Sequence, residues 1–316
     1  MPIDRRETRV NRVGSRPCLA SPFLLPYRVL VLRARVLRPI TLPAFPGSAL
    51  RGVFGHALRR LACLTQAPTC KDCLLRSRCT YARVFEPQPP EGARRLYSQV
   101  PAGFVLAPPV GLRPLESGEL LEFGLTLVGA GLSDAPLVLA AWRDALMLGL
   151  GPSKGTATLD QVIDCPVPDA GPAPSQVTLR FITPTYIKRG GQPLGPDQLT
   201  GAAVLRAAVR RVGDLLELQD NQHATIDFAS LGAAADRVRV KAAALAWADI
   251  ERWSNRHHRH MSFRGVVGRL DVAGDLDMLW PFLFAGQYLH VGGKTSFGLG
   301  RYLLQGEAWP AASVAA

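Results

Sequence analysis

A proline-rich segment at residues 165–175, CPVPDAGPAPS, divides the chain into two halves that each alternate strand-like and helix-like stretches. Proline fixes its own φ and lacks a backbone N–H, so a segment this rich in proline favours a linker over a helix or a central strand. A chain of 316 residues is long enough for two hydrophobic cores of ordinary size. We therefore predict two α+β domains, residues 1–170 and residues 171–316.

The segment GSALRGVFGHALRRLA, residues 47–62, has the pattern of an amphipathic helix. Its apolar residues recur at helical spacing, and they are Leu50, Val53, Phe54, Ala57, Leu58 and Leu61. Ser48 is a candidate N-cap. The opposite face carries Gly52, His56 and Arg59, so this helix is expected to bury one face and present polar groups on the other.

Hydrophobic periodicity and the positions of Gly and Pro assign the other elements. In the first half the predicted strands cover 27–38, 118–129 and 155–165, and a second helix covers 135–151. In the second half we predict strands over 175–189 and 260–274 and helices near 197–216, 234–251 and 277–286. No apolar run approaches the length of about 18 residues that spans a bilayer, and the N-terminus lacks the apolar core of a secretory signal. We expect a cytoplasmic protein that does not associate with membranes.

The net charge of +12 comes mainly from arginine. The guanidinium group matches phosphate oxygens and stacks on bases, so a chain this basic favours a polyanionic partner, with nucleic acid ahead of a membrane surface. The alternative is that a GC-rich genome favours arginine codons.

Four of the six cysteines lie within seventeen residues, as Cys63, Cys70, Cys73 and Cys79 in the loop 63–79. Four thiolates in one short segment can hold a zinc ion or a 4Fe–4S cluster. A disulfide pair is less favoured because cytoplasmic thiols stay reduced. The C-x6-C-x2-C-x5-C spacing resembles the 4Fe–4S loop of endonuclease III-type DNA glycosylases, although the helix-hairpin-helix and aspartate pattern of those enzymes is missing. Iron–sulfur and zinc both remain open, and Cys18 and Cys165 are read as ordinary thiols.

A glycine-rich segment, GGKTSFGLGRY at residues 292–302, follows the last predicted helix. Its glycines allow positive φ and close approach of the backbone to another group. Exposed N–H groups together with Lys294 and Arg301 would suit a phosphate backbone. A tight structural turn is the alternative interpretation.

This glycine-rich segment resembles the glycine-rich loop of the RAMP superfamily, and GSALRGVFGHALRRL resembles its first helix. The cysteine cluster followed by YARVFEP, and the ending GDLDMLWPFLFAGQYLHVGGKTSFGLGRY, are similar to CRISPR-associated repeat-RNA endoribonucleases. The resemblance implies two tandem ferredoxin-like (RRM-like) domains, with a cysteine-rich metal-binding insertion in the first. It also implies metal-independent cleavage of precursor CRISPR RNA within its repeats, leaving a 2′,3′-cyclic phosphate, and retention of the mature guide RNA. Other subunits of a CRISPR effector complex would be partners.

Metal-free RNA cleavage uses the substrate's own 2′-hydroxyl as the nucleophile, together with a base, an acid and a cation that stabilises the phosphorane. Histidine suits the acid–base role because its ordinary pKa is about 6.5. His56 is the leading candidate, since the family often carries its catalytic histidine on or near this helix, and Arg59 or Arg60 would stabilise the phosphate. His290 is the second candidate histidine, and a solvated surface histidine is the alternative for His56.

Further residues are predicted to contact RNA through phosphate or backbone groups. The predicted RNA-binding residues are Arg51, Arg256, His258, Arg259, Lys294, Ser296 and Arg301. Two other functions stay open: a non-catalytic RAMP subunit that only holds guide RNA, and an iron–sulfur DNA-repair protein. Motifs of serine hydrolases, zinc proteases and dinucleotide-binding enzymes do not occur in the sequence.

Overall fold

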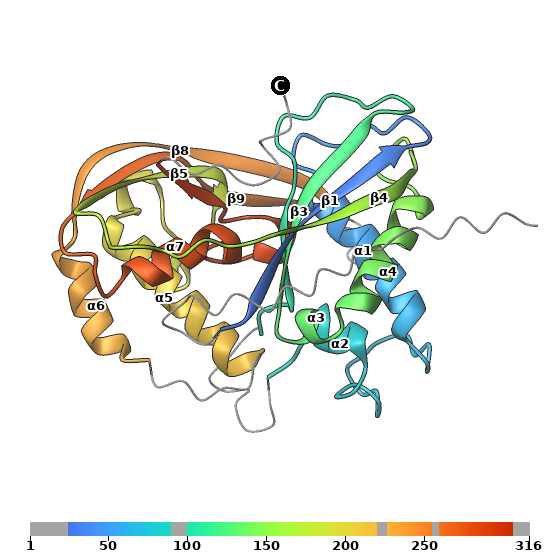
Figure 1. The fold of residues 1–316 in the computed structure, drawn as a ribbon, viewed down its shortest axis with the longest axis horizontal. Helices are drawn as coiled ribbons and strands as arrows, with labels where there is room; N and C mark the ends of the chain where they lie inside the picture. Colours follow the sequence, from blue (N-terminus) through green and yellow to red (C-terminus); the bar gives the residue numbers. More distant parts are fainter. Residues whose placement is uncertain (1–24, 90–99, 220–225, 255–258, 306–316) are drawn as a thin grey trace, which may run out of the picture.

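The computed structural model describes residues 25–89, 100–219, 226–254 and 259–305, and Figure 1 shows two sheets with their helices. The two sheets belong to the two predicted halves of the chain. The Pro-rich segment runs between the last strand of the first sheet and the first strand of the second. No helix of the described residues has the length and apolar character needed to cross a membrane.

The first domain has a four-stranded antiparallel sheet in the order β2-β3-β1-β4. Its strands are β1 (Tyr27–Val36), β2 (Phe104–Ala107), β3 (Leu120–Val128) and β4 (Ala157–Cys165). Its helices are α1 (Gly47–Ala62), α2 (Thr80–Val84), α3 (Ala130–Ser133) and α4 (Ala135–Leu148). Helices α1 and α4 pack side by side on one face of this sheet (Figure 1).

The second domain repeats this arrangement, with a four-stranded antiparallel sheet in the order β10-β5-β9-β8. Its strands are β5 (Gln176–Thr185), β8 (Arg239–Ser254), β9 (Arg259–Ala273) and β10 (Tyr302–Leu304), with a small hairpin of β6 (Lys188–Arg189) and β7 (Gln192–Pro193). Its helices are α5 (Gly201–Leu218), α6 (Phe228–Arg237) and α7 (Trp280–Leu289), with the 3-10 turns η2 (Pro196–Gln198) and η3 (Thr295–Phe297). In each domain the fourth main strand lies beside the first, and the third lies between the first and the second. This shared β-α-β-β-α-β order confirms the predicted tandem ferredoxin-like fold.

Helix α1 forms over the predicted residues because its apolar face meets the first sheet and α4. Leu50, Phe54 and Leu58 are fully buried. The Phe54 ring stacks on Trp142 with 4.7 Å between ring centroids. Two details of the prediction are wrong: Pro46, not Ser48, is the N-cap, and the apolar stripe ends early, since Leu61 is 42% exposed.

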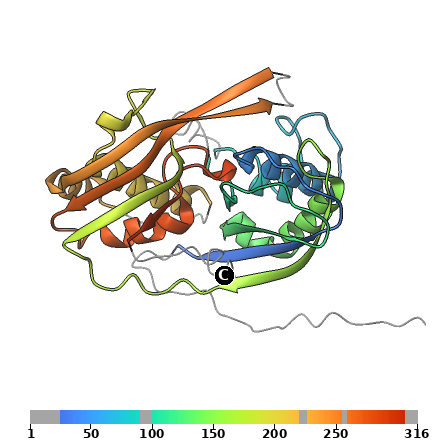
Figure 2. The ribbon, with the colours of Figure 1, turned by 90° about the horizontal axis from the view of Figure 1, so that it is seen from above.

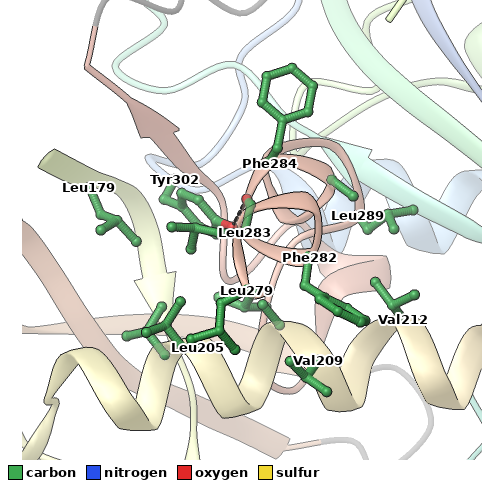
Figure 3. Packing of buried hydrophobic residues seen from close by; sticks show 14 of the residues in the cluster. Leu179, Leu205, Val209, Val212, Leu279, Phe282, Leu283, Phe284, Leu289 and Tyr302 are labelled. Atoms are coloured by element: carbon green, nitrogen blue, oxygen red, sulfur yellow. Dashed lines mark hydrogen bonds between the residues drawn. The ribbon is translucent and has the colours of Figure 1, made fainter. Parts of the chain in front are cut away.

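Part of the other face of the first sheet is covered by the second domain. Val29, Val31 and Val128 belong to one continuous buried cluster with residues of α5 and α7. Figure 3 shows the second-domain part of this cluster, where α5 packs against α7 and the Tyr302 hydroxyl donates to the carbonyl of Leu283. The first sheet is therefore packed on both faces at this end, whereas Arg35 and Asp160 further along the second face are exposed. The two domains share apolar packing.

The predicted helix at 234–251 is wrong. Helix α6 ends at Arg237, and residues 239–254 form strand β8. Alanine favours helices on its own, but β8 pairs with β9 along its whole length, and this tertiary pairing overrides a weak local preference.

The β8–β9 hairpin extends past the rest of its sheet, as Figure 2 shows. Strand β5 pairs with β9 only as far as Val266, whereas β8 pairs with β9 as far as Arg259.

Candidate active site

A cleft of ≈ 1650 Å³ lies between the two domains. One wall is the polar face of α1, and the other is formed by α5, strand β6 and the glycine-rich loop. The N-terminal helix and the C-terminal loop, which lie more than 200 residues apart in the sequence, thus face a common space. All the lining residues belong to the described part of the chain.

The start of α1 contacts the glycine-rich loop directly. A β-carbon at Gly47 would lie 1.8 Å from the carbonyl oxygen of Phe297, so only glycine fits there. The Arg51 guanidinium lies between two rings, 4.1 Å from the centroid of Phe85 and 4.4 Å from that of Phe297. Arg51 Nε also donates to Ser296 Oγ at 3.3 Å. Residues of this α1–loop junction, among them Arg51, Ser296 and Phe297, line the cleft.

His56 is exposed and lines the cleft from the middle of α1. Arg59, one turn further along, also lines it; its guanidinium lies 5.9 Å from the Tyr81 ring centroid and donates to the carbonyl of Ala67. Arg60 does not line the cleft, because it pairs with Asp144 of α4 at 2.7 Å. Of the two arginines considered as phosphate stabilisers, the structure therefore brings only Arg59 to the site of His56.

Lys294 and Ser296 line the cleft opposite α1. Lys294 adopts the left-handed conformation with φ 65°. Its Nζ lies 5.7 Å from the centroid of the Phe263 ring. The structure thus gathers His56, Arg59, Arg51, Lys294 and Ser296 around one cleft.

His290 and Arg301 lie inside the second domain instead. His290 is fully buried, and its Nδ1 is 3.1 Å from the carbonyl of Leu299, so Nδ1 carries the proton and donates it. Burial lowers the pKa of His290 well below its ordinary value, and the charges of Arg301 and Arg211 add to the effect. Arg301 is only 9% exposed. The structure therefore argues against His290 as the acid–base group and against direct RNA contact by the Arg301 side chain.

Three predicted RNA contacts fall in the sequence where β8 ends and β9 begins. Arg256 and His258 lie outside the described residues. Arg259 is described by its backbone, which pairs with Ser254 in the β8–β9 ladder.

Several lining residues were missed by the sequence reasoning. Arg206 and Arg210 lie on the cleft face of α5, where Arg206 pairs with Asp236 at 2.5 Å. Their i, i+4 spacing in the sequence was the available signal. The sequence could not show that the rings of Phe85 and Phe297 contact Arg51, because the three residues lie far apart in the chain.

The four clustered cysteines lie outside the cleft, in the connection between α1 and α2. Cys63 directly follows α1 and Cys79 directly precedes α2, and Thr65 Oγ1 lies 3.9 Å from Cys63 Sγ and 3.6 Å from Cys73 Sγ. Four thiols are the right donors for zinc or an iron–sulfur cluster. Within the described residues, however, no three His, Cys, Asp or Glu side chains are grouped closely enough to hold a metal ion. The four thiols are suitable metal ligands, but their side chains in this structure are not grouped closely enough to form a metal site.

Two family models match the chain. Residues 24–174 match AF_1859_N, described as an N-terminal domain, and residues 179–302 match the CRISPR-associated endoribonuclease Cas6. No curated protein matches the sequence.

Solved structures share the fold. A Thermus thermophilus Cas6 (TTHB231) is 16% identical with a TM-score of 0.54, covering 89% of this chain and 98% of that one. The Cas6 (TTHB231) product complex is 18% identical with a TM-score of 0.57, covering 88% and 99%. A partial Cas6-RT-Cas1–Cas2 complex is 14% identical with a TM-score of 0.55, covering 90% of this chain and 47% of that one.

Burial of His290 should make the protein less stable in mild acid. In the unfolded chain this histidine binds a proton near pH 6.5, whereas the lowered pKa in the folded state keeps it neutral, so stability falls as pH drops below about 6.5. We expect the free energy of unfolding to fall between pH 6.5 and pH 5 by up to about 2 kcal/mol more in the wild type than in a His290→Asn variant. Asparagine is chosen because it tolerates the positive φ of 55° at this position. Urea unfolding at both pH values measures the difference, and parallel pH profiles would contradict the assignment.

Replacing Arg51 should weaken the α1–loop junction. Arg51→Met keeps an apolar chain between the Phe85 and Phe297 rings but loses the cation–π contacts and the bond to Ser296, so we expect a loss of about 1–2 kcal/mol of stability. Urea unfolding measures it. The matched control is Arg60→Met, whose exposed pair with Asp144 should cost less than about 1 kcal/mol. Equal losses of unfolding free energy in the two variants would show that the contacts of Arg51 at the α1–loop junction stabilise the protein no more than an exposed ion pair does.

Proposed function

We propose that this chain, whose residues 179–302 match the CRISPR-associated endoribonuclease Cas6 family, is a RAMP-type protein of CRISPR RNA processing that cuts precursor CRISPR RNA in the cleft between its domains. The observation that carries this proposal is the position of His56. It is an exposed histidine in a basic cleft, on a helix that contacts the glycine-rich loop.

The proposed reaction needs no metal ion. The 2′-hydroxyl of one nucleotide attacks the adjacent phosphorus, and the bond from phosphorus to the 5′-oxygen of the next nucleotide breaks. The products are a 2′,3′-cyclic phosphate and a 5′-hydroxyl. His56 either removes the proton from the 2′-hydroxyl or supplies one to the leaving 5′-oxygen. Negative charge builds up on the non-bridging oxygens, where fixed cations stabilise it.

The lining of the cleft supports a proposal for these cationic roles that differs from the one based on the sequence pattern. Arg59, rather than Arg60, is the proposed stabiliser, because Arg60 is held by Asp144 away from the cleft. Lys294 and Ser296 are proposed to hold phosphate oxygens from the opposite wall, with Arg51 between the two walls. Arg256, His258 and Arg259 remain predicted RNA contacts.

We also propose that the four cysteines hold a structural zinc ion or 4Fe–4S cluster. The donor set supports this, together with the positions of Cys63 and Cys79 at the adjoining ends of α1 and α2. A group held by four thiolates has no open position for substrate. When bound, it would tie the end of α1 to α2 and so help to hold the helix that carries His56.

The proposed partners are CRISPR repeat RNA, the processed guide RNA and other CRISPR proteins. The basic charge of the chain supports the first two. A solved relative of this fold is part of a Cas6-RT-Cas1–Cas2 complex, which supports the third. The cytoplasm, where precursor RNA is available, is the proposed location.

The wild-type protein should cut a repeat RNA in the presence of EDTA. A panel of repeat-length RNAs transcribed from the CRISPR arrays of the source genome provides the probes, and electrophoresis under denaturing conditions measures the products. We expect His56→Ala to slow cleavage by about 10²-fold or more, and a 2′-deoxy substitution at the cut site to abolish it.

The control for this experiment is Arg60→Ala, which should cut at nearly the wild-type rate. Tight, salt-sensitive RNA binding with no cleavage by the wild type would indicate a non-catalytic guide-binding subunit instead. A preference for damaged duplex DNA would indicate a DNA-repair protein.

The cysteine loop should contain a metal. We expect anaerobically purified protein to contain about one zinc ion, or about four irons with visible absorption, per chain. Cys73→Ser should lose the metal, and its thermal stability and RNA affinity should fall. Its cleavage rate at saturating protein should be affected less. Cys165→Ala, which removes a thiol outside the cluster, should keep the metal. Metal-free wild-type protein of full stability would exclude the site, and a Cys73→Ser variant that binds RNA normally but does not cut it would contradict the supporting role.

A further inference from the structure

Gly52 lies in the second turn of α1, where glycine is unfavourable. In the interior of an exposed helix, glycine costs about 1 kcal/mol relative to alanine. Gly52 does not have the positive φ that would require glycine. Its backbone conformation therefore gives no reason for the residue.

Packing within the protein gives no reason either. A β-carbon at Gly52 would have no heavy atom within 4 Å, whereas one at Gly55 would lie 2.2 Å from the Phe85 ring. Gly47 and Gly55 are thus required by the parts of the fold that pack against them. Gly52 alone of these three α1 glycines faces open space.

That open space is the cleft in front of His56. Gly52 is exposed and lines the cleft, and His56 follows it by four residues, one turn along the same face of α1. Side chains on a helix lean toward its N-terminus, so His56 leans in the direction of Gly52, but no atom of its imidazole lies within 4 Å of where a β-carbon at position 52 would be. A side chain at position 52 would occupy the space beside that imidazole.

We propose that Gly52 leaves a notch in α1 that receives the ribose of the nucleotide whose 2′-hydroxyl attacks. This inference rests on the proposed function and adds to it the residue that sets how closely the ribose approaches His56. Gly52 is a positioning residue: it offers no reacting group but lets the sugar lie against the helix backbone. Reacting groups must approach within about 3–3.5 Å, and a misplacement of about 1 Å can cost about 10²-fold in rate.

The notch predicts opposite effects on stability and on catalysis. Alanine favours the helix and would contact no neighbour at position 52, so Gly52→Ala should shift the midpoint of urea unfolding to a higher urea concentration. The added methyl group displaces the ribose, so the single-turnover cleavage rate at saturating protein should fall by about 10- to 100-fold. RNA affinity should change by less than about threefold, because the phosphate contacts elsewhere in the cleft are intact. Gly52→Val should slow cleavage further.

Two matched variants separate this effect from helix propensity and from misfolding. Gly232→Ala on α6 adds a β-carbon 3.6 Å from the Arg206 guanidinium, an ordinary contact, and should leave the cleavage rate unchanged. Gly55→Ala should lower stability, because its β-carbon would collide with Phe85. The experiment measures urea unfolding, the dissociation constant for repeat RNA and the single-turnover rate for all variants.

Each outcome decides the inference. If the wild type cuts RNA and Gly52→Ala cuts at the same rate, the inference is overturned and the proposed function stands. If Gly52→Ala unfolds more easily, or loses affinity in proportion to its rate, the residue serves packing or binding and the positioning role is overturned. If the wild type itself leaves repeat RNA intact, both the proposed function and this inference fall.

Discussion

Apolar packing on both faces of the first sheet determines how the rest of the molecule is arranged. Its own helices cover one face, and the cluster formed by α5 and α7 covers part of the other, so Val29, Val31 and Val128 contribute to a core that lies mainly in the second domain. A sheet held from both sides gives α1 a fixed position relative to the second domain. The cleft depends on this, because its two walls come from different domains.

Helix α1 makes three different connections along its length. Its first residues contact the glycine-rich loop, where the Phe297 carbonyl leaves room only for glycine at position 47. Its middle presents His56 to the cleft, and its end leads into the cysteine loop. The buried side, with Phe54 stacked on Trp142, anchors all three. The helix is thus held at its start by the glycine-rich loop and along its buried face by the core, which suits a group whose position matters within a fraction of an ångström.

Local pattern was enough to predict α1 with its observed bounds, the Pro-rich linker and the five strands β1, β3, β4, β5 and β9, because periodicity and the positions of Gly and Pro are properties of short segments. It did not predict the short strands β2, β6, β7 and β10. It was not enough for β8, whose alanines favour a helix until β9 is beside them. The candidate site shows the same division. His56 could be placed on the polar face of α1 by spacing, but Arg60 was turned away by Asp144, which is distant in the sequence. His290 and Arg301 flank a loop that looks exposed in sequence, and only the fold shows that both are buried.

The shared core also bears on how the protein is made. Synthesis proceeds from the N-terminus, so the first sheet can form before α5 and α7 exist. Until the second half emerges from the ribosome, Val29, Val31 and Val128 have no partner surface and remain an apolar face in water. Docking of the second half covers that face and creates the cleft in the same event. A nascent or truncated chain therefore exposes an apolar face that favours aggregation, and it lacks the cleft. RNA can bind in the cleft only after both halves of the chain have folded.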